Sequence, residues 1–336
     1  MSNTTRNLIM NIQEKIEIII PTYNRAALLK ETLHKLLEKE SPVKNCRILV
    51  LDNNSTDTTG NLVKEFQQKH PNIHYIKNHY NIGIGGNIAR ALELVSLEYL
   101  WLLGDDDIIF WDAWPEVEKA ILKGEKVICA ANYTLQKGEG KSIPALLLQM
   151  SFISCNILHT SVFNDTEMSN IINNIYTLFP HLPPTIAYIN QGHTPYLLPK
   201  PLVTTGTKPS TDVSYIRGYD NKALYLKQRT MSWIVGYANV MAQIEKKKLK
   251  YQIIARSVQP PFFSWGELYM KMFSLYVIRG NFLPVLEVCR MLPWWKRIFC
   301  WLPIAFYQLN ESNAWYIFFF GLKTKIFPAT KRYLCK

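Results

Sequence analysis

Short runs of apolar and β-branched residues recur along the first 131 residues of the chain. They cover five segments: Ile16–Ile20, Arg47–Leu51, Ile73–Ile76, Tyr99–Leu103 and Val127–Ala131. Between them, apolar residues recur at helical spacing, as at Leu29, Leu33, Leu36 and Leu37. Strands that alternate with helices build a parallel sheet with helices on both faces. The pattern therefore predicts an α/β fold.

Polar segments follow four of the predicted strands. They are PTYNR at 21–25, DNNSTD at 52–57, NIGIGGN at 81–87 and GDDD at 104–107. Ligands bind beyond the carboxyl ends of the strands in open sheets of this kind, so we expect the chemistry in these segments. Taken alone, each segment is also compatible with an ordinary turn rich in Asn, Asp and Gly.

Three consecutive carboxylates, Asp105, Asp106 and Asp107, follow the fourth predicted strand. Their mutual repulsion destabilises them unless a cation or hydrogen-bond donors hold them. Carboxylate oxygens suit Mg²⁺ or Mn²⁺, and such ions usually bind through one or two carboxylates together with substrate phosphates. The sequence therefore predicts a divalent metal (Mg or Mn) that holds a diphosphate.

The formal net charge of +12 over 336 residues is unevenly distributed. Residues 217–336 contain 19 Lys and Arg against 5 Asp and Glu, and they include the aromatic clusters at 293–301 and 315–320. Interleaved basic and aromatic residues are typical of helices in the headgroup region of an anionic membrane, and a packed helical core is the alternative. Because no nucleic-acid-binding motif accompanies the charge, we expect no nucleic-acid partner.

The cysteines and the first residues indicate the compartment. The six cysteines form no C-x-x-C pair, which argues against a zinc site or a redox motif and favours a reducing cytosol. Residues 1–12 lack the apolar run of a signal peptide, and no run of 18 apolar residues predicts a spanning helix. We therefore expect a cytoplasmic protein, peripheral on the inner face of the cytoplasmic membrane.

The motifs IIIPTYNR, LVLDNNSTD, N-x-G-x-G-G-N and WLLGDDD, in this order, resemble family 2 glycosyltransferases of the GT-A nucleotide-diphospho-sugar transferase fold. The resemblance covers about residues 14–135. It is greatest to bacterial enzymes that build O-antigen, lipooligosaccharide or capsule, the abequosyltransferase-like branch included.

The resemblance, together with the composition of the last third, predicts the domain organisation. It implies a Rossmann-like GT-A catalytic domain at residues 1–216, with a nucleotide-sugar half at about 14–135 and an acceptor half at about 136–216. The charge and aromatic content of residues 217–336 predict a helical, basic and aromatic region after the catalytic domain, with membrane association as one interpretation.

The resemblance also implies roles for the polar segments. The loop after the first strand would hold the nucleotide, and the acidic residue after the second strand would contact the base. The implied residues are Pro21, Thr22, Tyr23, Asn24, Asp52, Asn53 and Ser55. The next helix would approach the donor through Asn81, Gly83, Asn87 and Arg90, although Arg90 is equally compatible with a surface ion pair.

In the family, a D-x-D motif binds the ribose and the metal. Gly104 stands where the commoner L-D-x-D-D pattern has its first Asp. This departure leaves two assignments open: Asp105 or Asp106 on the ribose side, and Asp106 or Asp107 as the principal metal ligand.

Transfer with inversion at the sugar needs a base beside the acceptor hydroxyl and a metal on the departing diphosphate. Many family members supply the base from a Glu-Asp pair, which this chain lacks. His181 stands at the corresponding distance and is the first candidate, because an imidazole with a pKa of about 6.5 accepts protons near neutral pH. Asp165 and Glu167 are the alternatives, and a structural role for His181 beside Pro180 is as compatible with the sequence.

These features predict an inverting glycosyltransferase that moves a sugar from a nucleotide-diphospho-sugar to a hydroxyl of a lipid-linked, lipooligosaccharide or capsule glycan. The alternatives are a nucleotidyltransferase, which should carry a Gly-rich loop after the first strand, or a non-catalytic nucleotide-binding protein. The segment at 21–25 contains no glycine. The sequence leaves the donor sugar, the acceptor and the oligomeric state open.

Overall fold

The structure, a computed structural model, describes residues 12–130, 142–206, 236–237 and 239–257. The chain divides into two units, Met1–Phe262 and Phe263–Lys336, and all described residues belong to the first. Most of the predicted basic and aromatic region at 217–336 therefore lies outside the described residues. No helix in the described ranges is long and apolar enough to cross a bilayer.

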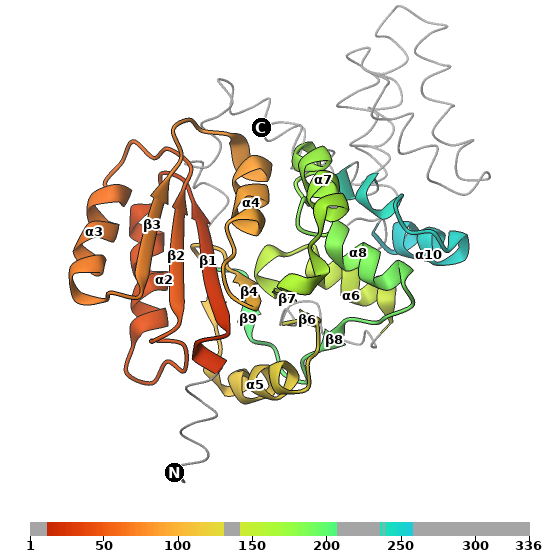
Figure 1. Cartoon of the computed structure of the whole chain (residues 1–336), viewed down its shortest axis with the longest axis horizontal. Coiled ribbons are helices and arrows are strands. Elements are labelled where there is room, and N and C mark those ends of the chain that lie inside the picture. The colour runs from red at the N-terminus through yellow and green to blue at the C-terminus, as the bar shows by residue number, and fades with distance from the viewer. Residues whose placement is uncertain (1–11, 131–141, 207–235, 238, 258–336) are drawn as a thin grey trace, which may run out of the picture. The chain divides into compact units, whose positions relative to one another are not determined.

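A seven-stranded sheet in the order β3-β2-β1-β4-β7-β6-β8 forms the centre of this unit (Figure 1). Its strands are β1 (Ile16–Thr22), β2 (Arg47–Asp52), β3 (Ile73–Lys77), β4 (Tyr99–Leu102), β6 (Val127–Cys129), β7 (Asn156–His159) and β8 (Tyr196–Leu197). A second sheet pairs β5 (Ile108–Ile109) with β9 (Val203–Thr204).

Helices connect most of these strands. The α-helices are α2 (Ala26–Leu37), α3 (Thr59–Lys69), α4 (Gly83–Glu93), α5 (Trp114–Leu122), α6 (Ile143–Met150), α7 (Asp165–Asn173), α8 (Pro183–Asn190) and α10 (Lys247–Ser257). The 3-10 helices are η1 (Trp111–Ala113), η3 (Ile153–Cys155), η4 (Thr160–Val162) and η5 (Ile175–Thr177). The structure thus confirms the predicted α/β class.

The sheet is mostly parallel rather than wholly parallel, which corrects the expectation from the sequence. Strands β3, β2, β1 and β4 are parallel neighbours, as predicted. The fifth predicted strand forms β6, but β7 lies between β4 and β6 and runs antiparallel to both. The sequence did not predict β7 because its four residues begin with Asn156 and end with His159, which leaves only two apolar positions between them.

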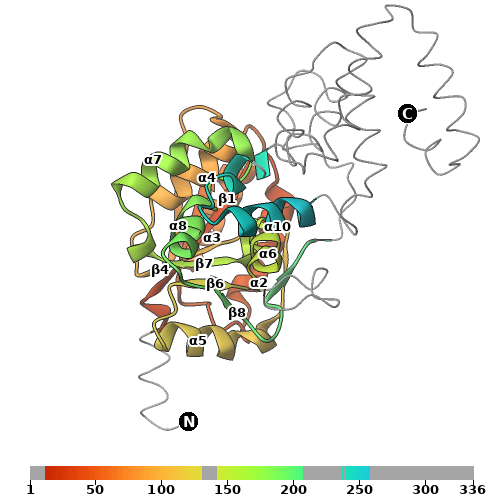
Figure 2. The ribbon, with the colours of Figure 1, turned by 90° about the vertical axis from the view of Figure 1, so that its right-hand side faces the viewer.

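Side chains alternate between the two faces of the sheet, as a pleated strand requires. Ile16, Ile18 and Ile20 of β1 share one core with Leu29 and Leu33 of α2, which confirms the helical spacing read from the sequence. The same core includes buried side chains of α3 and α5. Figure 2 shows α5 on one side of strands β4, β7 and β6, and α8 and α10 on the other. The sheet is therefore covered on both faces.

The start of α4 packs directly against η5. A Cβ atom on Gly85 would lie 1.8 Å from the carbonyl oxygen of Ile175, so only glycine fits at this position. Because α4 follows β3 and η5 follows α7, this contact joins the nucleotide half of the predicted catalytic domain to the acceptor half.

Candidate active site at the carboxyl ends of the strands

The register of the sheet brings four polar segments to one edge. Thr22 at the end of β1 lies opposite Asp52 at the end of β2, and Asp52 lies opposite Lys77 at the end of β3. Leu102 of β4 pairs with Ile19, three residues before the end of β1. The loops after all four strands therefore begin at the same edge, where sheets of this kind bind ligands.

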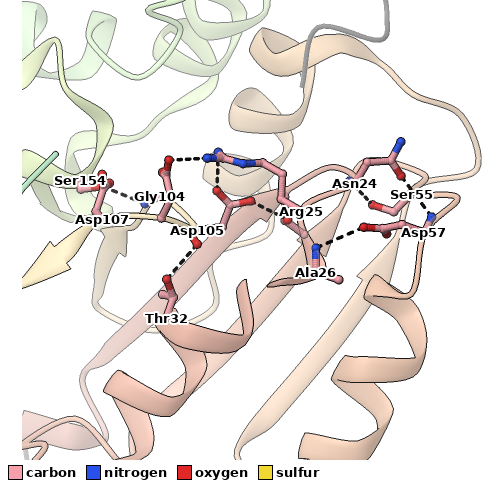
Figure 3. A network of polar contacts seen from close by, with 12 residues as sticks. Asn24, Arg25, Ala26, Thr32, Ser55, Asp57, Gly104, Asp105, Asp107 and Ser154 are labelled. Carbon is pink, nitrogen blue, oxygen red and sulfur yellow. Dashed lines mark hydrogen bonds and ion pairs between the residues drawn. The ribbon is translucent and has the colours of Figure 1, made fainter. Parts of the chain in front are cut away.

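The loops after β1 and β2 are held together by polar side chains (Figure 3). The Ser55 hydroxyl accepts a hydrogen bond from the Asn24 N–H at 2.8 Å, and Asn24 Oδ1 accepts one from the Thr56 N–H at 2.7 Å. Asp57 Oδ2 accepts from the N–H of Ala26, the first residue of α2, at 3.2 Å. Asn24 has φ 53°, a left-handed conformation that Asn adopts more readily than most residues. These contacts fix the start of α2.

Asp52 is fully buried, and both of its carboxylate oxygens are bonded within the protein. Oδ1 accepts from the Ser55 N–H at 2.7 Å, and Oδ2 accepts from the Tyr75 hydroxyl at 2.5 Å. Burial and the bond to Asp52 raise the pKa of Tyr75. Lys77 Nζ donates to the Ser55 carbonyl at 2.7 Å. Tyr75 and Lys77 were not identified as site residues from the sequence. The contact of Asp52 with a nucleotide base stays a prediction.

Four asparagine side chains hold the start of α4 beside the end of β2. Asn53 Oδ1 accepts from the Ile82 N–H at 3.0 Å, and Asn53 Nδ2 donates to Asn81 Oδ1 at 2.8 Å. Asn78 Nδ2 donates to Asn87 Oδ1, also at 2.8 Å. The structure thus brings together three of the residues predicted to bind the nucleotide-sugar donor. Asn78 belongs to the same cluster and was not identified from the sequence.

Four further residues were predicted to bind the nucleotide-sugar donor. Gly83 is exposed, has φ +75°, and its carbonyl accepts from Asn53 Nδ2 at 3.2 Å. Pro21 and Tyr23 are half-buried in the segment after β1. Arg90 is half-buried in the last turn of α4, where its buried Nε has no hydrogen-bond partner among the described residues. A direct role in donor binding stays a prediction for all four.

The Asp105 carboxylate is buried and hydrogen-bonded within the protein rather than exposed to solvent. The Thr22 hydroxyl donates to its Oδ2 at 2.7 Å. Arg25 Nη1 donates to its Oδ1, also at 2.7 Å (Figure 3). The Thr32 hydroxyl of α2 donates to its backbone carbonyl at 2.9 Å. Burial raises the pKa of Asp105 to about 6, although the positive charge of Arg25 opposes this shift. Asp105 therefore ties the end of β4 to the loop after β1.

Arg25 bridges two of the three acidic side chains. Its Nη2 forms an ion pair with Asp106, whose side chain is 30% exposed, while its Nη1 bonds the buried Asp105. The sequence analysis assigned Arg25 no role. A signal was present, because the loop that contains Arg25 and the acidic residues after β4 leave neighbouring parallel strands at the same edge of the sheet.

Asp107 is held on the opposite side by Ser154 of η3. The Ser154 hydroxyl donates to Asp107 Oδ2 and accepts from the Gly104 N–H at 2.8 Å. Burial and the charges of Asp106 and Asp105 raise the pKa of Asp107 to about 7, and the bond from Ser154 opposes this shift. A Cβ atom on Gly104 would lie 2.3 Å from Asp107 Oδ2. The missing first Asp of the family pattern therefore leaves room for the Asp107 carboxylate.

The acidic cluster fits a divalent cation that also binds substrate. No group of three or more His, Cys, Asp and Glu side chains in the described ranges is arranged to hold an ion without further ligands. Asp106 and Asp107 are adjacent oxygen ligands. Burial and the neighbouring negative charges raise the pKa of Asp107, and a bound cation would oppose this shift by favouring the ionised carboxylate. Ions such as Mg²⁺ commonly bind through one or two carboxylates and complete their coordination with phosphates and water.

His181 lies in the interior rather than at this edge. It is 0% exposed, its Nε2 lies 3.0 Å from the Met150 carbonyl oxygen, and its ring centroid is 6.2 Å from that of Phe179. Burial lowers the pKa of His181 to about 4, so the ring is neutral near pH 7. A base must contact the acceptor hydroxyl, and in this conformation neither ring nitrogen is accessible to an acceptor.

The two alternative bases lie in the first turn of α7. Asp165 is exposed, whereas Glu167 is 9% exposed and burial raises its pKa. Within the described chain, Glu167 Oε2 has no hydrogen-bond partner. Glu167 lines a pocket of about 410 Å³ together with Asn190 and Gln191, among others. None of the three base candidates hydrogen-bonds to the acidic cluster in the described residues.

Several curated proteins match part of the chain. A GalNAc(5)-diNAcBac-PP-undecaprenol beta-1,3-glucosyltransferase of Campylobacter jejuni is 34% identical over 94 residues, which are 28% of this chain and 30% of that protein. The abequosyltransferase RfbV of Salmonella typhimurium is 31% identical over 99 residues, which are 29% of this chain and 30% of the relative. The matched stretch thus spans about a third of each of these relatives.

Solved structures share the fold at low sequence identity. Staphylococcus aureus TarS 1-349 in complex with UDP-GlcNAc gives a TM-score of 0.54 at 16% identity and covers 87% of this chain and 89% of its own. The mannosyltransferase PcManGT of Pyrobaculum calidifontis, in complex with GDP-Man and Mn²⁺, gives 0.51 at 13% identity and covers 95% and 82%. The GT-A fold expected from the sequence is therefore confirmed.

A family model settles the membership that these similarities indicate. The model described as glycosyl transferase family 2 matches residues 17–190, just over half of the chain. The matched range contains the strand-end network and all three acidic residues. The chain therefore belongs to glycosyl transferase family 2.

Proposed function

We propose that this glycosyltransferase transfers a sugar, with inversion, from a nucleotide-diphospho-sugar to a hydroxyl group of a lipid-linked or polysaccharide glycan. The observation that carries the proposal is that the three acidic side chains differ in how they are bonded and buried. Asp105 is bonded internally by Thr22 and Arg25, whereas Asp106 and Asp107 remain half-buried at the edge where a donor would bind.

In this proposal Asp106 and Asp107 hold a divalent metal ion. When bound, such an ion neutralises charge on the departing diphosphate. Ser154 orients the Asp107 carboxylate, and Arg25 orients that of Asp106. Because Asp105 has both carboxylate oxygens bonded within the protein, we assign it to positioning and the ribose side to the neighbouring loops.

The donor class is supported by the solved relatives. The TarS 1-349 structure is a complex with UDP-GlcNAc, and the PcManGT structure is a complex with GDP-Man and Mn²⁺. For this chain we propose a nucleotide-diphospho-sugar of either kind, held by the segments after β1, β2 and β3. The asparagine cluster would hold the start of α4 beside the donor, and the backbone N–H groups after Gly83 would face it, because helix N-termini bind anions. The N–H groups of Ile82 and Gly83 are themselves bonded to Asn53 and Asn81.

The acceptor class is supported by the curated relatives. The name of the Campylobacter jejuni protein specifies a glycan on undecaprenyl diphosphate, and RfbV is an abequosyltransferase. A lipid-linked acceptor would keep the enzyme peripheral on the inner face of the cytoplasmic membrane. We propose this location, with anionic lipid as a partner.

We propose Glu167 rather than His181 as the base. A base works best when its pKa lies near the operating pH, and burial shifts the pKa of Glu167 upward but that of His181 downward, to about 4. Glu167 also lines a pocket, whereas the His181 ring is enclosed. Asp165 remains the exposed alternative on the same helix.

Membership in the family argues against the two alternative functions. A nucleotidyltransferase would release inorganic diphosphate from a nucleoside triphosphate, and a non-catalytic binding protein would turn over no donor. A panel of nucleotide-sugars, with nucleoside diphosphate release measured with and without EDTA, separates these alternatives from a glycosyltransferase.

Asp106→Asn and Asp107→Asn should each reduce metal-dependent nucleoside diphosphate release by about 100-fold or more, because each removes a charged oxygen ligand from the proposed metal. The matched control is Asp112→Asn, since the Asp112 side chain is 68% exposed and lies 3.6 Å from Lys200. Full activity of both variants, or of the parent protein in excess chelator, would contradict the metal role.

Glu167→Gln should lower kcat by about 100- to 10,000-fold with little change in donor KM, because a base acts on the acceptor in the transition state. His181→Gln should keep kcat, since Gln retains a donor for the Met150 carbonyl. If steady-state kinetics show loss of kcat in His181→Gln and none in Glu167→Gln, the base is His181. If only Asp165→Asn loses kcat, the base is Asp165.

His181 should also make the fold sensitive to acid. Its folded-state pKa of about 4 lies below the unfolded value of about 6.5, so the unfolded state binds more protons between these values. The free energy of unfolding should therefore fall as pH decreases from about 6.5 to about 4, and the slope should be shallower in His181→Gln. Urea titrations at several pH values measure this; equal slopes would argue against a neutral, buried His181.

The basic and aromatic region should contribute to membrane binding. Lys296 and Arg297, which lie outside the described residues, should each contribute about 1 kcal/mol near anionic lipid. Changing both to Gln should weaken binding to anionic vesicles about tenfold or more and leave nucleoside diphosphate release unchanged. Unaltered vesicle binding in a sedimentation assay would favour the packed-core interpretation of this region.

A further inference from the structure

The turn between α6 and β7 carries the hydroxyl group that holds Asp107. Ser154 lies in this turn and is 0% exposed, and its hydroxyl bonds both the Asp107 carboxylate and the Gly104 N–H. Its backbone carbonyl accepts a hydrogen bond from Trp101 Nε1 of β4 at 3.0 Å. A hydroxyl hydrogen can rotate to suit its partners, but the backbone sets the place of the oxygen. The position of the turn therefore decides whether Ser154 reaches Asp107.

One buried asparagine side chain bonds the carbonyl groups of this turn. Asn156, the first residue of β7, is 0% exposed, and its Nδ2 lies 2.9 Å from the backbone carbonyl oxygens of Met150, Phe152 and Ile153. An amide nitrogen carries two N–H donors, so two of these carbonyls share one of them. An amide oxygen in the same place would face three acceptors, which fixes the nitrogen of the side chain toward the turn.

The backbone of Asn156 is held by the sheet on both sides. It pairs with Leu102 of β4 and with Cys129 of β6. Leu102 lies two residues before Gly104, where the acidic segment begins. Asparagine is uncommon in strands, and a buried amide is costly unless it is hydrogen-bonded. Asn156 thus connects the strand that leads into the acidic cluster with the turn that carries Ser154.

The start of the turn has a second side-chain donor. Met150 is the last residue of α6, and the last carbonyls of a helix lack partners within it. Its carbonyl oxygen lies 3.0 Å from His181 Nε2, which must carry the proton because a carbonyl only accepts. The carbonyl of Ile153, next to Ser154, is bonded by Asn156. Of the two side chains, Asn156 therefore acts closer to the hydroxyl group that holds Asp107.

We propose that Asn156 is a positioning residue for the metal site: it holds the turn so that the Ser154 hydroxyl orients Asp107 toward the ion. The inference rests on the proposed function, in which Asp106 and Asp107 hold a divalent metal. Groups that bond to a metal ligand fix its orientation, and their loss typically lowers metal affinity or activity by about 10- to 100-fold. Asn156 acts one step further from the metal, through Ser154.

The experiment measures Mn²⁺ binding to the full-length protein, without donor, from the EPR signal of the free ion. Ser154→Ala removes the hydroxyl group and should weaken binding by about 10- to 100-fold, and Asn156→Ala should weaken it by about tenfold. Because Asn156 is proposed to act through Ser154, the two losses should not add. The double variant should therefore bind Mn²⁺ about as Ser154→Ala does.

Asn72→Ala is the matched control for an asparagine that only stabilises the fold. Asn72 Nδ2 donates to the carbonyls of Lys44 and Cys46 at 3.0 and 2.7 Å. These residues precede β2 and β3, at the opposite edge of the sheet from the acidic cluster. Asn72→Ala should lower the melting temperature and keep the Mn²⁺ affinity of the parent. If Asn156→Ala does not fold, Asn156→Ser, which keeps one donor on a shorter side chain, replaces it in the same cycle.

Three results would overturn the proposal. The first is a Mn²⁺ affinity of the Asn156 variant that equals the parent while Ser154→Ala binds more weakly. The second is a double variant in which the two losses add, since Asn156 would then act by a route other than Ser154. The third is an equal loss in Asn72→Ala, which would assign the effect to general destabilisation.

A failure of the proposed function gives a different result. If the parent itself binds no Mn²⁺, the metal role of Asp106 and Asp107 is wrong, and the positioning role of Asn156 is rejected with it. If the parent and Ser154→Ala differ in Mn²⁺ affinity but the parent and the Asn156 variant do not, the metal role stands and only the role of Asn156 is rejected.

Discussion

The arrangement of the site depends on the burial of one carboxylate. Asp105 is 3% exposed, and a buried charge is tolerated only when it is paired and hydrogen-bonded. Thr22 and Arg25 meet this requirement, and both come from the end of β1 and the loop that follows it. The pairing draws that loop toward the end of β4, and it leaves the second guanidinium nitrogen of Arg25 for Asp106.

Much of the strand and loop arrangement could be predicted because it depends on local patterns of apolar and polar residues. Buried strands in a parallel sheet need continuous apolar runs, and such runs marked β1 to β4 within a few residues of their observed bounds. The carboxyl ends of parallel strands lie at one edge, so the polar segments after them had to approach each other. Asp105, Asp106 and Asp107 were found for this reason, without any knowledge of their individual contacts.

The remainder depends on contacts between distant parts of the chain. The partner of Asp107 is Ser154, and that of Asp105 is Arg25, and nothing in the spacing of the acidic residues identifies either one. His181 was expected at a catalytic position because of its place along the chain, but packing decides whether an imidazole reaches solvent. The antiparallel strand β7 escaped prediction because its pairing with β4 and β6, rather than its own composition, makes it a strand.

Ser154 links the acidic cluster to the segment expected from the sequence to form the acceptor half. It precedes β7 by two residues, and its hydroxyl contacts both Asp107 and the backbone of Gly104, which lie in the expected nucleotide half. The support of Asp107 therefore depends on a residue about 50 positions further along the chain. A chimera that joined this nucleotide half to the acceptor half of a relative would inherit a correctly supported Asp107 only if the donated segment carried a hydroxyl at the position of Ser154.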